Sequence, residues 1–213
     1  MTTRLLIVRH GNTFGPGDIV TRVGLTDLPL VESGLEQGRQ LGRYLKQAGM
    51  IPDVIFTSHL KRTQQTAGEA QKEMGTALAT ETLTIFNEID YGPDENKPED
   101  AVVARLGKAA LENWDAEGVV PDGWNVDPKA IIANWKSFGA DILKKYAGKT
   151  VMVVTSNGIA RFAPHLTGDF YAFRQQHAIK ISTGALCLFE NNGGAAWTCT
   201  GWNIKPKDKL KAA

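Results

Sequence analysis

Three short and almost wholly apolar segments constrain the fold more than any other feature of this sequence. They are Arg4 to Val8 (RLLIV), Asp53 to Thr57 (DVIFT) and Thr150 to Thr155 (TVMVVT). Nearly continuous apolar runs of this length are typical of strands that are buried on both faces. Longer segments with helical spacing separate them, and this alternation predicts an α/β protein whose sheet is covered by helices.

Further strands are predicted on either side of these segments. Leu83 to Phe86 is a weaker fourth strand. Ser182 to Glu190 and Ala196 to Ile204 flank the sequence Asn191-Asn192-Gly193-Gly194. Asparagine and glycine pairs adopt the positive φ values that tight β-turns require, so we expect these two segments to form a hairpin.

The first two predicted helices have recognisable ends. Ser33 and Glu36 have the spacing of a capping box, in which the serine caps the helix and the glutamate reaches back to it. The second helix follows Ser58 and stops near Gly75.

Two more helices are predicted in the second half of the chain. One begins near Pro98 and continues to Trp114, with apolar residues along one side. The other begins at Asp127, a helix cap followed by proline at the first helical position, and Gly148 closes it. Its apolar stripe is predicted to belong to the core rather than to a cofactor site; it comprises Ile131, Trp135, Phe138 and Ile142.

Length and composition narrow the class of protein. The 213 residues predict one domain spanning residues 1–213. With 24 basic and 23 acidic residues, the charge argues against nucleic-acid or membrane-surface binding, and no apolar run approaches the ~20 residues of a membrane span. The start of the chain does not read as a signal peptide, and Cys187 and Cys199 are expected to be reduced, so we expect a cytoplasmic protein.

Polar residues follow the predicted strands where each one ends. Arg9 and His10 follow the first strand, His59 and Arg62 follow the second, and Ser156 follows the strand from Thr150. Ligands of such α/β proteins bind beyond the carboxyl ends of the strands. The sequence therefore predicts a site where arginines, one or two histidines and a carboxylate converge.

Several of these segments together resemble the histidine phosphatase superfamily, in its phosphoglycerate-mutase-like branch. The matching segments are LIVRHGNT at 6–13, GLTDLPLVESGLEQG at 24–38, SHLKRTQQTA at 58–67 and VVTSNGIAR at 153–161, together with the acid at Glu88. The resemblance spans about residues 4 to 190. It implies a three-layer α/β/α sandwich with a mostly parallel central sheet.

The resemblance also implies which residues perform chemistry. His10 matches the nucleophile that becomes a phosphohistidine, and covalent catalysis of this kind splits one displacement into two easier ones. Glu88 matches the proton donor, with Asp90 as the competing carboxylate. No metal and no organic cofactor is implied.

The arginines match the phosphate clamp of the family. Arg9 and Arg62 suit this role because a planar guanidinium donates two parallel hydrogen bonds to phosphate oxygens. Asn12 and Thr13 follow the nucleophile, and either donate to phosphate or act as structural caps.

One position departs from the family. Where a second histidine usually stands five residues before an arginine, this chain has Ser156. Ser156 and Asn157 lie at a strand-to-helix junction, which favours an anion, and we expect them to bind phosphate. His59 is a candidate to supply the missing cation, against the alternative of an ordinary surface histidine.

These observations predict a phosphomonoester hydrolase that acts on a small phosphorylated substrate. A weak or inactive phosphate-binding or regulatory member of the fold is one alternative, and a mutase-type phosphotransferase is another. Mutases follow their first histidine with a Trp-Asn-rich segment, which the residues at 14–17 (FGPG) do not match. The variable segment from about Tyr91 to Asp127 is expected to select the substrate. The sequence does not indicate the oligomeric state.

Overall fold

The computed structural model describes residues 1–210, so residues 211–213 of the predicted domain lie outside the description. Its sheet has the strand order β3-β2-β4-β1-β5-β6. The strands are β1 (Thr3–Arg9), β2 (Val54–Thr57), β3 (Thr80–Thr82), β4 (Thr150–Thr155), β5 (Leu186–Asn191) and β6 (Thr198–Ile204). Strands β1 to β4 pair in parallel, whereas β5 pairs antiparallel with β1 and with β6.

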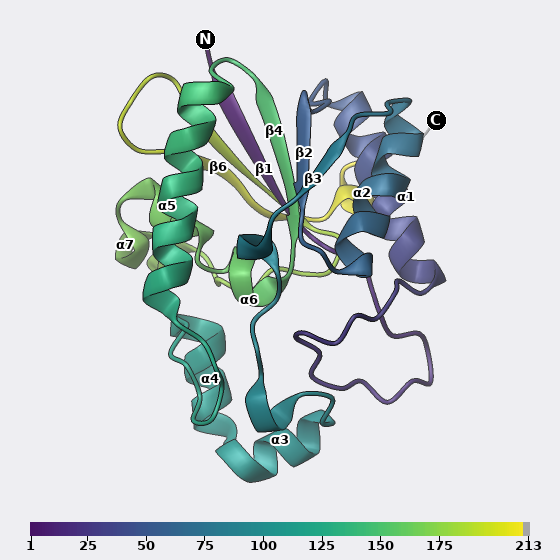
Figure 1. The fold of residues 1–213 in the computed structure, drawn as a ribbon, viewed down its shortest axis with the longest axis vertical. Helices are drawn as coiled ribbons and strands as arrows, with labels where there is room; N and C mark the ends of the chain where they lie inside the picture. Colours follow the sequence, from purple (N-terminus) through teal and green to yellow (C-terminus); the bar gives the residue numbers. More distant parts are fainter. Residues whose placement is uncertain (211–213) are drawn as a thin grey trace.

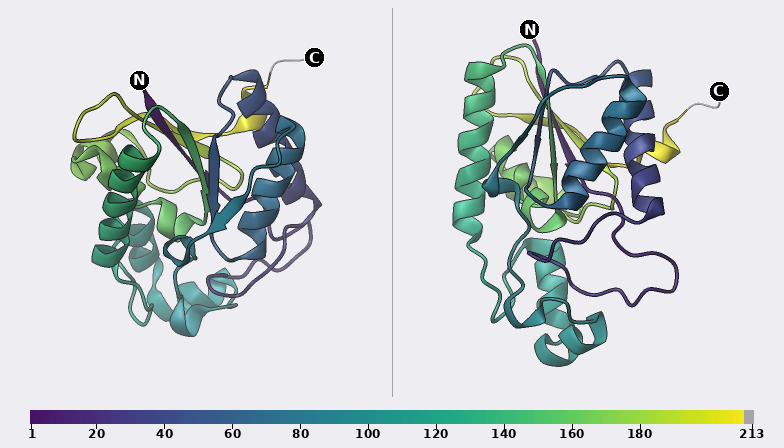
Figure 2. Two further views of the ribbon diagram at one scale, coloured as in Figure 1. Left: turned by 45° about the horizontal axis from the view of Figure 1, so that its top comes forward. Right: turned by 45° about the vertical axis from the view of Figure 1, so that its right-hand side comes forward.

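Helices cover both faces of this sheet (Figures 1 and 2). The pair α1 and α2 lies on one face and α5 on the other, which confirms the predicted three-layer α/β/α arrangement. The helices are α1 (Glu32–Gln47), α2 (Lys61–Met74), α3 (Glu99–Leu106), α4 (Lys108–Glu117), α5 (Pro128–Lys145), α6 (Asn157–Ala160) and α7 (Phe170–Gln176). Short 3-10 helices occupy Thr84–Phe86, Gly92–Asp94, Ala163–Thr167 and Pro206–Asp208.

The central strands are buried on both faces, as their apolar runs predicted. Side chains of β1 alternate between two clusters: Leu5 and Ile7 pack toward α5, whereas Leu6 and Val8 pack toward α1 and α2. All four are fully buried. The period of two along a strand produces this division, and it fixes the register of the sheet against both helical layers.

The predicted fourth strand is wrong in position. Residues 84–86 form a 3-10 helix, and the edge strand β3 lies earlier, at Thr80–Thr82. The backbone N–H of Leu83 donates to the carbonyl of Thr57 at the end of β2. Three residues later, the N–H of Phe86 donates to the carbonyl of Leu83 and closes a turn. The apolar side chain of Phe86 is buried in the core through this turn rather than through strand pairing.

The predicted capping box is also wrong. Helix α1 begins at Glu32, with Val31 before it and no side-chain cap. Ser33 accepts a hydrogen bond from Asn12, and the Glu36 carboxylate is paired with Arg39 and Arg43. Tertiary contacts thus occupy both side chains that the local motif would have used.

The helix predicted from Pro98 to Trp114 is two helices. Gly107 separates α3 from α4, with φ of 79° and ψ of 154°, a conformation that favours glycine. The start of α5 is as predicted, because the Asp127 carboxylate accepts from the N–H groups of Lys129 and Ala130. That helix ends at Lys145, before the turn at Gly148.

The predicted hairpin and the reduced cysteines are confirmed. Strands β5 and β6 form the predicted hairpin. Cys187 and Cys199 are free thiols. Within residues 1–210, no helix combines the length and apolar character needed to cross a bilayer.

Candidate active site

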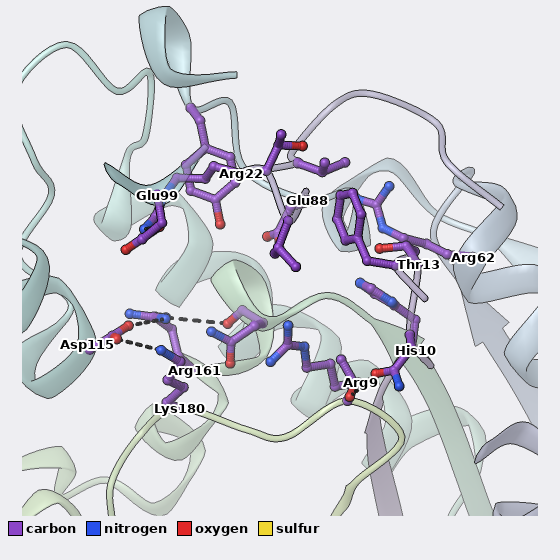
Figure 3. Close-up of a pocket in the computed structure, with 18 of the residues that line it drawn as sticks. Arg9, His10, Thr13, Arg22, Arg62, Glu88, Glu99, Asp115, Arg161 and Lys180 are labelled. Atoms are coloured by element: carbon purple, nitrogen blue, oxygen red, sulfur yellow. Dashed lines mark hydrogen bonds and ion pairs between the residues drawn. The ribbon is translucent and has the colours of Figure 1, made fainter. Parts of the chain in front are cut away.

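A cavity of about 430 Å³ opens at the carboxyl ends of the parallel strands (Figure 3). Most of the predicted site residues line it: Arg9, His10, Asn12, Arg62, Glu88 and Asn157. They come from the ends of β1 and β4, the start of α2 and the loop after the first 3-10 helix. Because parallel strands end at one edge of the sheet, residues far apart in sequence meet here.

The turn after β1 aims His10 into the cavity. The backbone N–H of His10 donates to Thr155 of β4 at 3.0 Å, and the N–H of Gly11 donates to the Thr66 hydroxyl at 3.0 Å. A Cβ on Gly11 would lie 2.4 Å from the carbonyl oxygen of Gly34, at the start of α1. Only glycine permits the close approach that holds this turn against α1 and α2.

The imidazole of His10 is held neutral and oriented. Its Nδ1 lies 2.7 Å from the carbonyl oxygen of Gly11, which only accepts, so Nδ1 carries the proton and Nε2 keeps its lone pair. Burial lowers the pKa of His10 well below its ordinary value, and the positive charges of Arg62 and Arg9 lower it further. A neutral imidazole with a free Nε2 is the form that attacks an electrophile.

Two guanidinium groups lie beside this ring, one buried (Arg62) and one partly buried (Arg9). Arg62 is 1% exposed and donates to the carbonyls of Thr26 at 2.8 Å and Gly24 at 2.7 Å. Arg9 donates to the carbonyl of Ile181 at 2.5 Å, and within the described residues its buried Nε has no partner. Burial lowers the pKa of both groups, and the nearby Glu88 carboxyl opposes that shift. Backbone carbonyls fix each guanidinium in place and leave other N–H donors free to bind a ligand.

Glu88 is the carboxylate of the cavity. Its oxygens accept from the N–H of Ile89 at 3.0 Å and the N–H of Gly158 at 3.3 Å. Burial raises its pKa, and Arg62 opposes that shift only in part. The competing Asp90 does not line the cavity; hydrogen bonds from Asn125 and Gly92 lower its pKa and keep it charged. Glu88 is therefore the group suited to deliver a proton.

The amide side chains have structural partners. The Asn12 carbonyl accepts from the Thr183 hydroxyl at 2.5 Å, and its amide donates to Ser33 at 3.2 Å. The Asn157 carbonyl accepts from the N–H of Ile181 at 2.9 Å. Both residues line the cavity while they hold neighbouring loops together.

Two predicted phosphate ligands are not where they were expected. His59 is exposed and outside the cavity lining; its backbone N–H donates to Asn87, and Arg62 of the same segment takes the inward position. Ser156 is fully buried and does not line the cavity, and its hydroxyl has no partner among the described residues.

The structure adds residues that the sequence did not single out as ligands. Arg161 is 1% exposed, donates to the carbonyl of Trp114 and stacks 4.1 Å over its ring. Asp115 pairs with Arg161 at 3.3 Å and with Lys180 at 2.7 Å. Arg161 could have been found from its place at the end of the 153–161 motif. Asp115 in α4 and Lys180 in the segment between α7 and β5 carry no such signal, because only the fold brings them together.

Arg22 and Tyr91 form a further part of the wall. The Arg22 guanidinium lies 5.5 Å from the centre of the Tyr91 ring and 5.2 Å from that of Trp124, and it pairs with Glu99. Trp114 and Trp124 are buried and contact each other edge to face, with ring centroids 5.4 Å apart, and Trp114 also lines the cavity. Among residues 1–210, no group of three or more His, Cys, Asp or Glu side chains is arranged to hold a metal ion.

Comparison with known proteins gives concordant results. The model of the histidine phosphatase superfamily (branch 1) matches residues 5–205. A 2,3-bisphosphoglycerate-dependent phosphoglycerate mutase from Methylorubrum populi is 36% identical over 123 residues, which are 57% of this chain and 57% of the relative. The chain thus matches less than two thirds of the length of such relatives. The mutase of the same name from Parvibaculum lavamentivorans is 26% identical over 89% of this chain and 91% of its own length.

Solved structures share the fold. A mycobacterial glucosyl-3-phosphoglycerate phosphatase superimposes with a TM-score of 0.77 at 19% identity, covering 95% of this chain and 99% of the other. A phosphoserine phosphatase from Entamoeba histolytica gives 0.73 at 18% identity, covering 95% and 98%.

Proposed function

Because this chain belongs to the histidine phosphatase superfamily, branch 1, we propose that it hydrolyses phosphomonoesters through a phosphohistidine on His10. One observation carries the proposal. A neutral imidazole with a free Nε2 shares one cavity with the guanidinium groups of Arg9 and Arg62 and with a carboxyl group whose pKa is raised. These are the parts that phosphoryl transfer to a nitrogen nucleophile requires.

The first step transfers the phosphoryl group to the enzyme. Nε2 of His10 attacks phosphorus, the bond from phosphorus to the ester oxygen breaks, and protonated Glu88 gives its proton to the departing alkoxide. In the second step, ionised Glu88 takes a proton from water, the resulting hydroxide attacks phosphorus and the P–N bond breaks. Inorganic phosphate leaves, and Glu88 is again protonated.

Arg9 and Arg62 supply the electrostatic part of catalysis. Charge spreads over the three non-bridging oxygens of the phosphoryl group in the transition state, and fixed guanidinium donors stabilise it without reorganisation. The carbonyl contacts of Arg62 hold its fork in one orientation before the substrate arrives.

Ser156 favours a second candidate. The family position that usually holds a histidine here presents a buried hydroxyl that does not reach the cavity. Losing one preorganised donor costs about 10²- to 10³-fold in rate. A phosphate-binding member with slow turnover, which retains the arginines, is therefore the alternative to an efficient phosphatase.

We also propose that the substrate is small and phosphorylated, and that the protein acts in the cytoplasm. The cavity volume of about 430 Å³ supports a small-molecule ligand. The two free thiols and the near-neutral charge support the location and argue against nucleic acid as a partner.

A labelling experiment tests the function. The protein is mixed with a ³²P-labelled aryl phosphate, quenched and examined for label that is lost in acid and retained in alkali, as expected for phosphohistidine. We expect label and phosphate release in the wild type and neither in His10→Ala. Phosphate release that His10→Ala leaves unchanged would refute the nucleophile. Tight phosphate binding without label would favour the second candidate.

A further inference from the structure

We propose that an apolar groove beside the active-site cavity binds the leaving group, and that the preferred substrates are phosphomonoesters with an extended apolar alkyl or aryl group. The inference rests on the proposed function for the placement of the phosphoryl end at His10. It assigns a substrate class to the cavity and a binding role to the segment around α3 and α4.

The groove lies between α3, α4 and the chain before Ile179. Its volume is about 540 Å³, and apolar side chains form most of its surface: Val103, Leu111, Ala116 and Ala178. Three residues, Glu99, Asp115 and Lys180, line both this groove and the active-site cavity. The two spaces are therefore neighbours that share one wall.

Two of the three shared residues, Asp115 and Lys180, form an ion pair that is exposed to solvent. Lys180 Nζ lies 2.7 Å from Asp115, and the two side chains are 57% and 40% exposed. Water screens a pair of this kind, so its opening costs little. Asp115 keeps its second partner Arg161 at 3.3 Å when Lys180 moves aside. A leaving group can thus pass from the cavity into the groove without breaking the buried part of the site.

The direction in which the leaving group departs also points toward the residues that the cavity and the groove share. Attack by His10 expels the leaving oxygen on the opposite side of phosphorus, since the transfer is in line. In Figure 3, Glu99, Asp115 and Lys180 lie across the cavity from Arg9, His10 and Arg62. The organic part of a bound phosphomonoester therefore extends toward the groove.

The lining of the groove selects the chemistry of that organic part. Val103 and Leu111 offer the groove its largest apolar side chains, and five charged residues also line it: Glu99, Lys108, Glu112, Asp115 and Lys180. Contact with the apolar side chains is favourable for carbon, and these side chains offer a polyhydroxyl group no hydrogen-bond partners. An alkyl chain or an aromatic ring fits this surface.

Alkylphosphonates test the groove without requiring turnover. We measure the affinity of methyl- through hexylphosphonate by calorimetry and, separately, the KM of the corresponding alkyl phosphates. Each methylene that enters the groove should tighten binding about two- to fourfold, so hexylphosphonate should bind at least ~10-fold more tightly than methylphosphonate. Equal affinity along the series, or no binding of any phosphonate, would overturn the inference.

A groove-filling variant separates this site from nonspecific apolar binding. Ala116 is an exposed residue of α4 that lines the groove, and Ala116→Trp should reduce the hexyl-to-methyl affinity ratio to about 1. The matched control is Ala79→Trp, at an exposed alanine beside the edge strand β3 that lines neither space, which should keep the wild-type ratio. An unchanged ratio in Ala116→Trp would overturn the proposal. Chain-length-dependent binding without any hydrolysis would instead refute the proposed function and leave the groove standing.

Discussion

Replacing Gly158 by alanine is the most specific perturbation of the proposed proton donor. The added Cβ would lie 2.4 Å from Oε1 of Glu88 and 2.9 Å from Cγ1 of Ile89. Gly158 has no positive φ, so alanine adopts its backbone conformation without strain. The effect of the substitution is therefore steric. It displaces the Glu88 carboxyl group and disturbs its hydrogen bond from the Gly158 N–H.

The geometry gives the expected size of the effect. Ordinary van der Waals contact begins at 3.4 Å, so the carboxylate must retreat by about 1 Å from the 2.4 Å position. A displacement of ~1 Å at a reacting group costs about 10²-fold in rate. Overpacking against Ile89 costs roughly 1–3 kcal/mol of stability, which lowers the melting temperature by about 2–4 °C per kcal/mol in a chain of this size.

Two leaving groups distinguish a displaced acid from a general loss of activity. Ethyl phosphate needs a proton on its departing oxygen, whereas 4-nitrophenyl phosphate departs readily as the anion. We expect Gly158→Ala to lower kcat/KM, which reports phosphoryl transfer to His10 and not the later attack by water, about 10²-fold for ethyl phosphate and much less for 4-nitrophenyl phosphate. The matched control is Gly68→Ala in α2, where no atom lies within 4 Å of the new Cβ. An equal loss with both substrates, or none with either, would refute the reasoning about Glu88.

Three more changes have defined outcomes. Arg62→Lys should lower kcat/KM about 10²- to 10³-fold in steady-state assays, because one ammonium cannot bind two loop carbonyls and a phosphate together; wild-type kinetics would exclude the clamp. The pH profile of kcat/KM should rise through the lowered pKa of His10 and fall through the raised pKa of Glu88. Glu88→Gln should remove the falling limb, and its persistence would assign that limb to another group. Asp94→Ala leaves the Trp124 indole N–H, bonded at 2.7 Å, without its acceptor; it should cost about 2 kcal/mol in denaturant unfolding, and a loss below ~0.5 kcal/mol would contradict this.

The sequence predicted correctly those elements that depend only on neighbouring residues or on their own apolar composition. A strand buried on both faces, such as Leu5 to Val8, carries its burial in its composition, and the cap at Asp127 needs only the residues that follow it. Ser33 failed as a cap because Asn12, which arrives from another part of the chain, binds its hydroxyl. The prediction of a strand at Phe86 was wrong because an apolar side chain can be buried from a 3-10 turn as well as from a strand, and composition does not distinguish the two.

The same distinction applies to the candidate site. Residues at strand ends, such as His10 and Arg62, were predictable because the topology of parallel strands gathers those ends. The prediction for His59 was wrong because proximity to Arg62 in the sequence does not determine which of the two side chains points into the cavity. Asp115 lies in α4 and Lys180 in the segment between α7 and β5, and only the packing of the whole fold brings them together, so their spacing in the sequence does not predict the pair.

Burial in this cavity acts in opposite directions on the pKa values of the proposed nucleophile and the proposed acid. Desolvation disfavours charge on both groups, so it lowers the pKa of His10, which favours a free Nε2, and raises that of Glu88, which favours the protonated carboxyl. The arginines act in opposite directions on the two: their charge reinforces the neutrality of His10 and opposes that of Glu88. When a phosphate dianion binds, it offsets those charges. Glu88 then loses part of the field that favours its ionisation, so substrate binding itself strengthens the protonated state that the first step consumes. In the proposed first step, transfer of the Glu88 proton to the departing alkoxide leaves an ionised Glu88 near Arg62, and this carboxylate can accept a proton from water in the second step.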